Sequence, residues 1–104
     1  MAKLCESWSE SSCRFEEVTL ERLRDFFRVK GKATNLMNCT LPHLQLRLSI
    51  LDSRGRVLAD DIFHIIDRKL EPKGACEFKA EGEWKLGMSK VKVTVRPYPF
   101  VEEK

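Results

Sequence analysis

Cysteine and histidine are the residues of this sequence with the widest range of possible chemistry. Thiols and imidazoles can hold a metal ion, form disulfides, or act as nucleophile and base. The four cysteines are Cys5, Cys13, Cys39 and Cys76, and no two of them have the C-x-x-C spacing of zinc ribbons and thioredoxin-like sites. His43 follows Cys39 by four positions and supplies only half of a metal site, and His64 stands apart from both. The sequence therefore predicts no metal site, no cofactor, and structural or surface roles for both histidines.

The cysteines could also form disulfides. Four cysteines allow three connectivities, and these spacings select none of them. Cys76 alternates with Phe78 in a predicted strand, so we expect a buried thiol there. Cys5 lies in a Ser-rich segment and is expected to be the most reactive. We expect all four thiols to be reduced and structural, with Cys5–Cys13 as the pair if any disulfide forms.

Catalytic carboxylate pairs and known catalytic motifs are the next source of chemistry. Asp60 and Asp61 are adjacent in a predicted strand, which sends their side chains to opposite faces and prevents joint acid–base work. The sequence contains no G-x-S-x-G, no phosphate-binding glycine loop and no H-E-x-x-H. We therefore expect a protein that is not an enzyme.

Basic side chains form two stripes with period-2 spacing. Such stripes can bind an acidic protein, anionic lipid or a nucleic-acid backbone, although a solvated strand face gives the same pattern. The aromatic residues that would stack on bases are not interleaved with them, which argues against nucleic acid. The candidate partner-binding residues are Arg28, Lys30, Lys32, Lys90, Lys92, Arg96 and the loop residue Trp84.

Length and composition indicate one globular domain. The chain has 104 residues, 42% of them hydrophobic, and a formal net charge of +3. Residues 1–12 read as a loose tail, 13–100 as the domain and 101–104 as a second tail. No apolar run reaches the length of a membrane span, and the N-terminus lacks the apolar core of a signal peptide. The chain as written is therefore expected in the cytoplasm, or outside it if a native export segment precedes this sequence.

The strands that position these residues are read from alternating apolar side chains. Strands are predicted at about 26–34, 44–51, 56–66, 75–82 and 90–96. The segment 56–66 has apolar residues on both faces, which indicates a bulge or burial on two sides. Residues 14–27 stay ambiguous between a strand at about 14–20 followed by a bend and a helix that begins at Thr19. We favour the strand.

The regular spacing of these strands predicts an all-β fold. Six to seven short strands about ten residues apart are typical of an immunoglobulin-like antiparallel β-sandwich. Its expected core consists of Val29, Leu44, Leu46, Leu48, Ile50, Phe78, Val91, Val93 and Val95. Structural roles in close packing, strand ends and turns are expected for Gly31, Asn35, Asp52, Gly55 and Pro72.

The order of these residues resembles a known domain family. The run Val29-x-Gly31-x-Ala33-x-Asn35 is followed by the alternating leucines from Leu44, the Asp52-x-x-Gly55 turn and Pro72-x-Gly74. This arrangement over residues 27–80 resembles the FxLYD family and similar immunoglobulin-like domains of prokaryotic envelopes. Ile50-Leu51-Asp52 stands where that family has Leu-Tyr-Asp, and Ala33 replaces its usual valine.

The resemblance implies a function without catalysis. Domains of this kind are interaction or spacer modules, often on the outer side of a membrane. We therefore expect a protein-interaction or structural module that is associated with the envelope and binds a protein partner. The alternative is a small domain that binds nucleic acid or an anionic surface through its basic strand faces.

Overall fold

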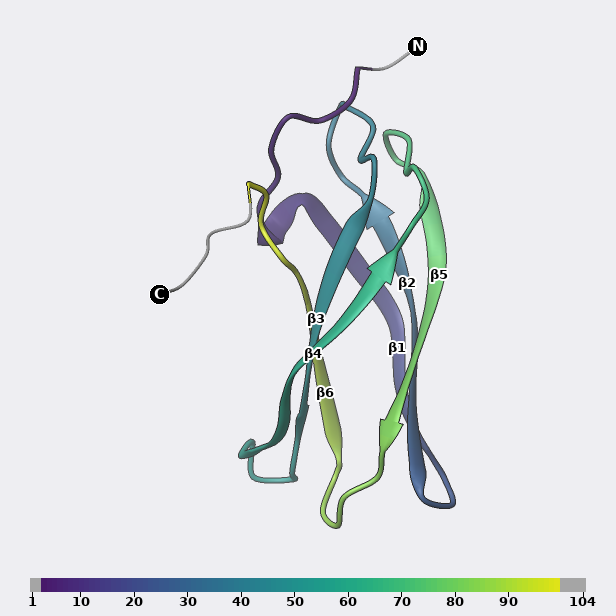
Figure 1. Cartoon of the computed structure of the whole chain (residues 1–104), viewed down its shortest axis with the longest axis vertical. Helices are drawn as coiled ribbons and strands as arrows, with labels where there is room; N and C mark the ends of the chain where they lie inside the picture. The colour runs from purple at the N-terminus through teal and green to yellow at the C-terminus, as the bar shows by residue number, and fades with distance from the viewer. Residues whose placement is uncertain (1–2, 100–104) are drawn as a thin grey trace.

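The described part of the chain forms six antiparallel strands and one short 3-10 helix. The computed structural model describes residues 3–99, apart from the side chain of Asp61. The elements are η1 (Glu10–Ser12), β1 (Cys13–Leu23), β2 (Phe26–Asn35), β3 (Leu44–Leu51), β4 (Val57–Ile66), β5 (Ala75–Glu83) and β6 (Lys90–Val95) (Figure 1). Within residues 3–99, no helix is long and apolar enough to cross a membrane.

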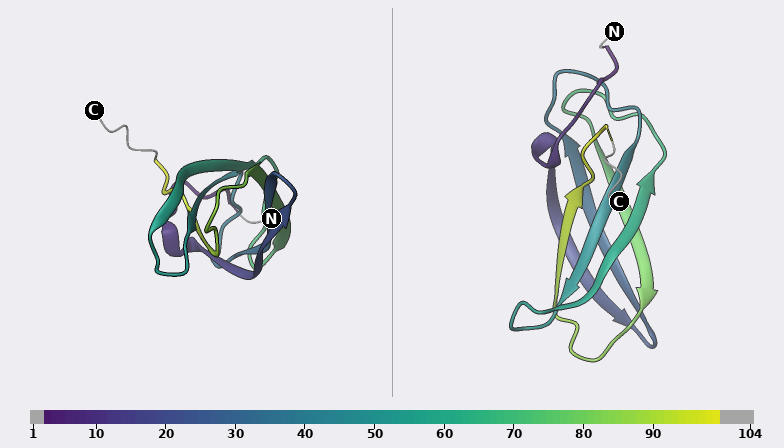
Figure 2. Two further views of the ribbon diagram at one scale, coloured as in Figure 1. Left: turned by 90° about the horizontal axis from the view of Figure 1, so that it is seen from below. Right: turned by 60° about the vertical axis from the view of Figure 1, so that its left-hand side comes forward.

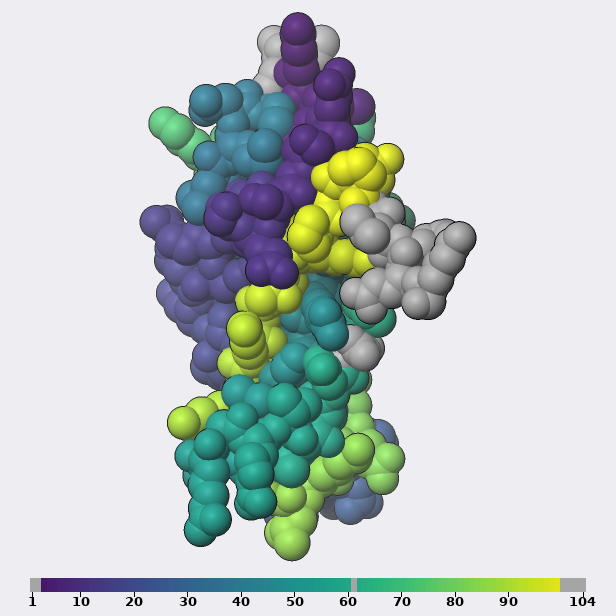
Figure 3. Space-filling model, turned by 90° about the vertical axis from the view of Figure 1, so that its left-hand side faces the viewer, coloured from purple at the N-terminus to yellow at the C-terminus, as the bar shows by residue number. Residues whose placement is uncertain are grey.

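The six strands form two three-stranded sheets that pack face to face. The first sheet has the order β1-β2-β5 and the second the order β4-β3-β6, and every pairing is antiparallel. β1 and β6 lie side by side and close one side of the sandwich (Figures 2 and 3). The predicted all-β sandwich and its five clear strands are confirmed, with bounds that differ from the predicted ones by one residue at most.

The core lies between the sheets, where inward side chains alternate with outward polar ones. Seven of the nine predicted core residues are buried: Val29, Leu44, Leu46, Leu48, Ile50, Phe78 and Val95. Val91 and Val93 are only partly buried and pack against this cluster. Both belong to β6, which is the outer strand of its sheet and so has a neighbour on one side only.

The ambiguous segment 14–27 forms the long strand β1, and no helix is present there. β1 pairs with β2 from Cys13 to Leu23, with a register shift between Glu16 and Thr19. Glu17, at this bulge, has a φ of 55°. Glu17 and Val18 stand opposite Gly31 alone, and this one extra residue lets Phe15 and Val18 both pack against the core although they are three positions apart. The broken alternation of the sequence is therefore the mark of this bulge.

Residues 3–12 are packed against the sandwich, so the predicted loose tail is wrong for them. The Trp8 side chain is buried and stacks on the Tyr98 ring with 4.6 Å between centroids. The two residues also exchange backbone hydrogen bonds, and the space-filling view shows residues 3–12 running beside the chain around Tyr98 (Figure 3). The predicted tail at 101–104 lies outside the described residues.

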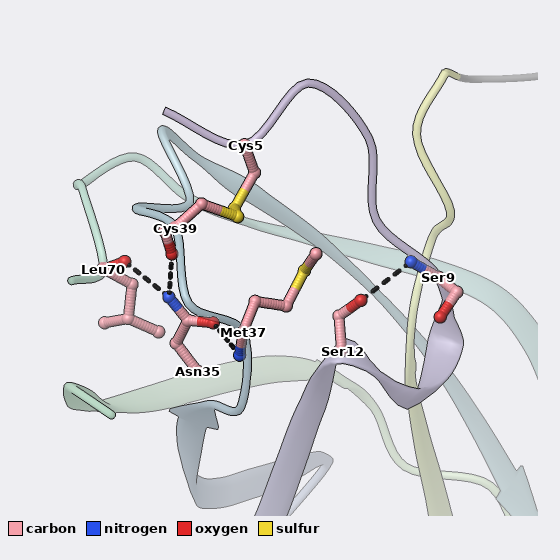
Figure 4. Close-up of a disulfide and its surroundings, with 7 residues drawn as sticks. All are labelled: Cys5, Ser9, Ser12, Asn35, Met37, Cys39 and Leu70. Carbon is pink, nitrogen blue, oxygen red and sulfur yellow. Dashed lines mark hydrogen bonds between the residues drawn. A yellow bond between two sulfur atoms is a disulfide. The ribbon is translucent and has the colours of Figure 1, made fainter. Parts of the chain in front are cut away.

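A disulfide joins Cys5 to Cys39 (Figure 4). The expectation of reduced thiols throughout is therefore wrong for these two residues, and so is the Cys5–Cys13 pair expected if any bond formed. Cys5 is also not the exposed, reactive thiol that was expected, because it is only 7% exposed. Backbone hydrogen bonds between Cys5 and Thr40, and between Thr40 and Lys3, lay the N-terminal segment along the loop that contains Cys39. Cys13 instead begins β1 and faces the interior. Cys76 is buried as predicted.

Candidate functional site

The basic stripe on β2 lies on the outer face of the first sheet, but carboxylates flank it on both sides. Arg28 stands between Glu21 of β1 and Glu81 of β5 in the strand register. Its Nη2 atom is 3.6 Å from Glu81 Oε2, and Lys30 Nζ is 3.5 Å from Glu21 Oε1. Lys32 likewise has a glutamate opposite it on each neighbouring strand. The stripe is therefore part of a mixed-charge lattice, which attracts a polyanion weakly.

An open depression of about 580 Å³ lies on the same face, beside the β1 bulge. Gly31 is one of its lining residues, and on the packed side a Cβ at this position would come within 2.6 Å of Phe78 Cζ. The close packing expected at Gly31 is thus confirmed. Its polar lining mixes cations and carboxylates, namely Lys30, Lys32, Lys79, Glu17 and Glu77 together with Thr19. This mixture offers no paired nucleophile and base.

The second basic stripe lies on the outer face of the other sheet and has fewer carboxylates around it among the side chains that the structure describes. Arg96 donates a hydrogen bond of 3.0 Å from Nη1 to Gln45 Oε1. Arg47 Nη2 is 3.7 Å from Asp60 Oδ2. Lys92 is exposed opposite Ser49, and Lys90 lies further down, at the start of β6. This face therefore keeps a basic character that the first sheet lacks.

Apolar side chains stand beside these cations on the edge strand β4. Phe63 is 49% exposed and Ile65 is 64% exposed, and both point outward from the second sheet. The Arg96 guanidinium carbon lies 6.0 Å from the centre of the Phe63 ring. Apolar residues on both faces of 56–66 predicted a bulge or burial on two sides, and the register between β3 and β4 does shift, between Leu48 and Ile50. In the structure the outward side is uncovered.

The other face of β4 opens on a gap in the sandwich. Among the described strands only β3 pairs with β4, and β4 forms no ladder with β5. A depression of about 430 Å³ lies between these two edges, with Phe27, Leu58 and Ile62 on its apolar lining. β4 thus presents apolar side chains on both sides and an edge of unpaired backbone.

His43 and His64 pack against different aromatic rings, and the two free thiols, Cys13 and Cys76, are buried. His43 packs edge-on against Trp8 with 5.6 Å between ring centroids, whereas His64 lies on β4 with its pKa lowered by burial. Burial raises the pKa of Cys13 to about 11, and a protonated thiol is a poor nucleophile. Burial also raises the pKa of Cys76. In the part of the chain that the structure describes, no group of three metal-ligating side chains occurs.

Four of the predicted structural residues occupy turns and strand ends. Asn35 is fully buried at the end of β2, where its amide binds two loops (Figure 4). Asp52 Oδ1 accepts hydrogen bonds from the backbone N–H groups of Arg54 and Arg56, and the Arg56 bond above all lowers the pKa of Asp52. Gly55 closes that turn with a φ of 86°, and Pro72 lies in the turn between Glu71 and Gly74.

The last predicted contact residue, Trp84, lies at the far end of the sandwich from the disulfide. It is half-buried, and the Arg22 guanidinium carbon is 5.3 Å from its ring centre. It shares a depression with Arg22, Asp25 and Leu86. Trp84 is thus separate from both basic stripes.

Comparison with known proteins supports the fold. No family model matches the chain, and no curated protein matches it. Among solved structures, the chain is similar to a DUF1425 family member from Shewanella sp. pv-4, with a TM-score of 0.59 and 18% sequence identity over 86% of this chain and 85% of that one. At this identity the likeness shows the shared β-rich fold alone, and the finer resemblance to FxLYD domains is not confirmed.

Proposed function

We propose that the chain is a non-catalytic interaction module that binds a protein partner along the edge strand β4. One observation carries this proposal: β4 has the apolar pattern of a strand covered on both faces, yet it lies at a sheet edge with Phe63 and Ile65 exposed. Strands with apolar residues on both faces are normally central ones. An added partner strand would make β4 central and cover both residues.

The charges around the patch indicate the chemistry of the partner. Arg47, Lys92 and Arg96 belong to the same outer face, and among the described side chains Asp60 and Glu10 are the carboxylates beside them. A partner with acidic side chains beside its apolar ones would complement this face, because complementary potentials accelerate encounter and select partners. The alternative, binding of nucleic acid or an anionic surface through the β2 stripe, has less support because glutamates flank that stripe.

The disulfide supports a location outside the reducing cytosol. Structural disulfides persist mainly in oxidising compartments, and Cys5–Cys39 is buried within the packed N-terminal segment. An envelope-associated module, as the family resemblance implies, fits this observation. Trapping free thiols in intact cells tests it: two blocked thiols per chain are expected, and four would contradict an oxidising location.

Site-specific photocrosslinking in native cells tests the interaction surface. A photoreactive phenylalanine analogue replaces Ile65, and in a matched control it replaces Lys79, which is exposed on the outer face of the other sheet. We expect a discrete protein adduct from position 65 that disappears with the additional substitution Phe63→Ser. Adducts of equal yield from both positions, or none from position 65, would contradict the proposal.

A further inference from the structure

Three turns gather at the end of the sandwich opposite the disulfide. They are the β1–β2 turn at 24–25, the β3–β4 turn at 52–56 and the β5–β6 loop at 84–89 (Figures 1 and 2). We call this set the loop end. Cys5–Cys39 and the packed N-terminal segment lie at the other end (Figure 1). The loop end is centred away from Phe63 and Ile65, and it meets the proposed β4 surface only where Val57 begins β4 and Lys85 lines the depression beside that strand.

Large apolar side chains are exposed at the loop end. Leu86 is 93% exposed in the β5–β6 loop, the highest value of any large apolar residue of the described chain. Phe26 is 58% exposed where β2 begins, and Val57 is 55% exposed where β4 begins. Trp84 is half-buried beside Leu86, in the depression that both residues line. Contact between these apolar side chains and water is unfavourable, and exposed apolar patches commonly mark binding sites, so this patch points to a docking role.

Cations surround these apolar side chains. The exposed basic residues of the loop end are Arg22, Arg24, Arg54, Arg56, Lys85 and Lys90, and its acidic residues are Asp25, Asp52 and Glu83. Asp52 is buried within its own turn, where it accepts hydrogen bonds from two backbone N–H groups and from Arg56. Because Asp52 pairs with Arg56, the two exposed carboxylates Asp25 and Glu83 stand against five further exposed cations.

We propose that the loop end docks on the surface of an anionic lipid bilayer. An apolar tip with a collar of cations matches the two layers of such a surface: acyl chains below and phosphate groups above. Leu86 enters the boundary between headgroups and acyl chains, and Lys85 and its neighbours contact the phosphates. Trp84 lies at the interface, where indole rings accumulate. A membrane contact at the loop end would account for the exposure of Leu86 and for the cations around it.

Vesicle binding tests this proposal. The full chain is sedimented with vesicles of phosphatidylcholine alone or mixed with phosphatidylglycerol, at low and high salt. We expect binding to the mixed vesicles that weakens with salt. Leu86→Ser should weaken it about tenfold, as expected for the loss of one buried leucine. Lys85→Gln should weaken it about fivefold through one lost cation.

Matched controls separate the loop end from the rest of the surface. Leu36 is 51% exposed next to the loop that holds Cys39, so Leu36→Ser should leave vesicle binding unchanged. Brominated lipids should quench Trp84 and spare Trp8, which is buried under Tyr98. Absence of binding to mixed vesicles, equal binding to neutral vesicles, or equal losses from Leu86→Ser and Leu36→Ser would each overturn the proposal. These results do not depend on whether β4 binds a protein.

Discussion

Asn35 is the residue whose replacement tests the structure of the disulfide end most directly. Its side chain is fully buried, and its Nδ2 group donates hydrogen bonds of 2.9 Å to the carbonyl oxygens of Cys39 and Leu70. Its Oδ1 atom accepts a bond of 2.8 Å from the N–H group of Met37. The side chain thus holds the 36–43 and 67–74 loops to the end of β2.

Asn35→Ala removes all three of these bonds. A buried hydrogen bond contributes about 1 kcal/mol net, and the variant leaves two loop carbonyls and one loop N–H group without their partner. We therefore expect the free energy of unfolding to fall by about 3 kcal/mol. Asn35→Asp keeps the acceptor but turns a carboxylate oxygen toward two carbonyls. That variant should therefore be at least as destabilised at neutral pH, and should recover part of the loss in acid, where a protonated carboxyl can donate again.

Urea denaturation followed by circular dichroism, with the disulfide intact, measures both variants. Asn38→Ala is the matched control, because Asn38 is exposed in the same loop and its replacement should change stability by less than about 0.5 kcal/mol. A loss below about 1 kcal/mol for Asn35→Ala would refute the reasoning, because the three bonds would then not form in solution.

Three further substitutions test other parts of the fold. The double variant Cys5→Ser/Cys39→Ser should lose about 4 kcal/mol of unfolding free energy, because the bond closes a loop with a sequence separation of 34; a wild-type chain whose urea midpoint is unchanged by reductant would disagree. Because hydrogen bonding lowers the pKa of Asp52 in the folded state, its stabilising effect is present above the unfolded pKa of about 3.9 and lost as pH falls through the folded value. Acid titration of stability should therefore be flatter for Asp52→Asn, and identical curves would count against this account. Gly31→Ala should cost about 1–3 kcal/mol through the clash with Phe78, and Phe78→Leu should restore part of it; additive losses in the double variant would show that the two residues do not meet.

The strands could be predicted because their periodicity is local. The alternation from Leu44 to Ile50 requires one buried face, so the register of β3 follows once a sandwich is assumed. The Asp52–Gly55 turn follows from the residues that accept its geometry. In β1 the alternation of apolar and polar residues was harder to recognise, because the bulge at Glu17 shifts it partway along the strand.

The disulfide and the surfaces could not be predicted from spacing. Cys5 meets Cys39 because Trp8 is buried under Tyr98, a contact between opposite ends of the chain that no local pattern encodes. Likewise, the charge of the β2 stripe depends on which residues of β1 and β5 lie beside Arg28. Neighbours across a sheet are set by the long-range register, so a basic stripe in the sequence became a mixed lattice in the structure.

The position of the Cys5–Cys39 bond also determines how the domain would respond to mechanical force. All of β1 and β2 lie between the two cysteines, within the covalently closed loop. Tension applied at the N-terminal side would pass through the sulfur atoms directly to Cys39 and leave the β1–β2 hairpin unloaded. Single-molecule pulling of the oxidised chain should therefore release about 120 Å less contour length than pulling of the reduced chain. For as long as it is intact, the bond therefore shields the β1–β2 hairpin from tension.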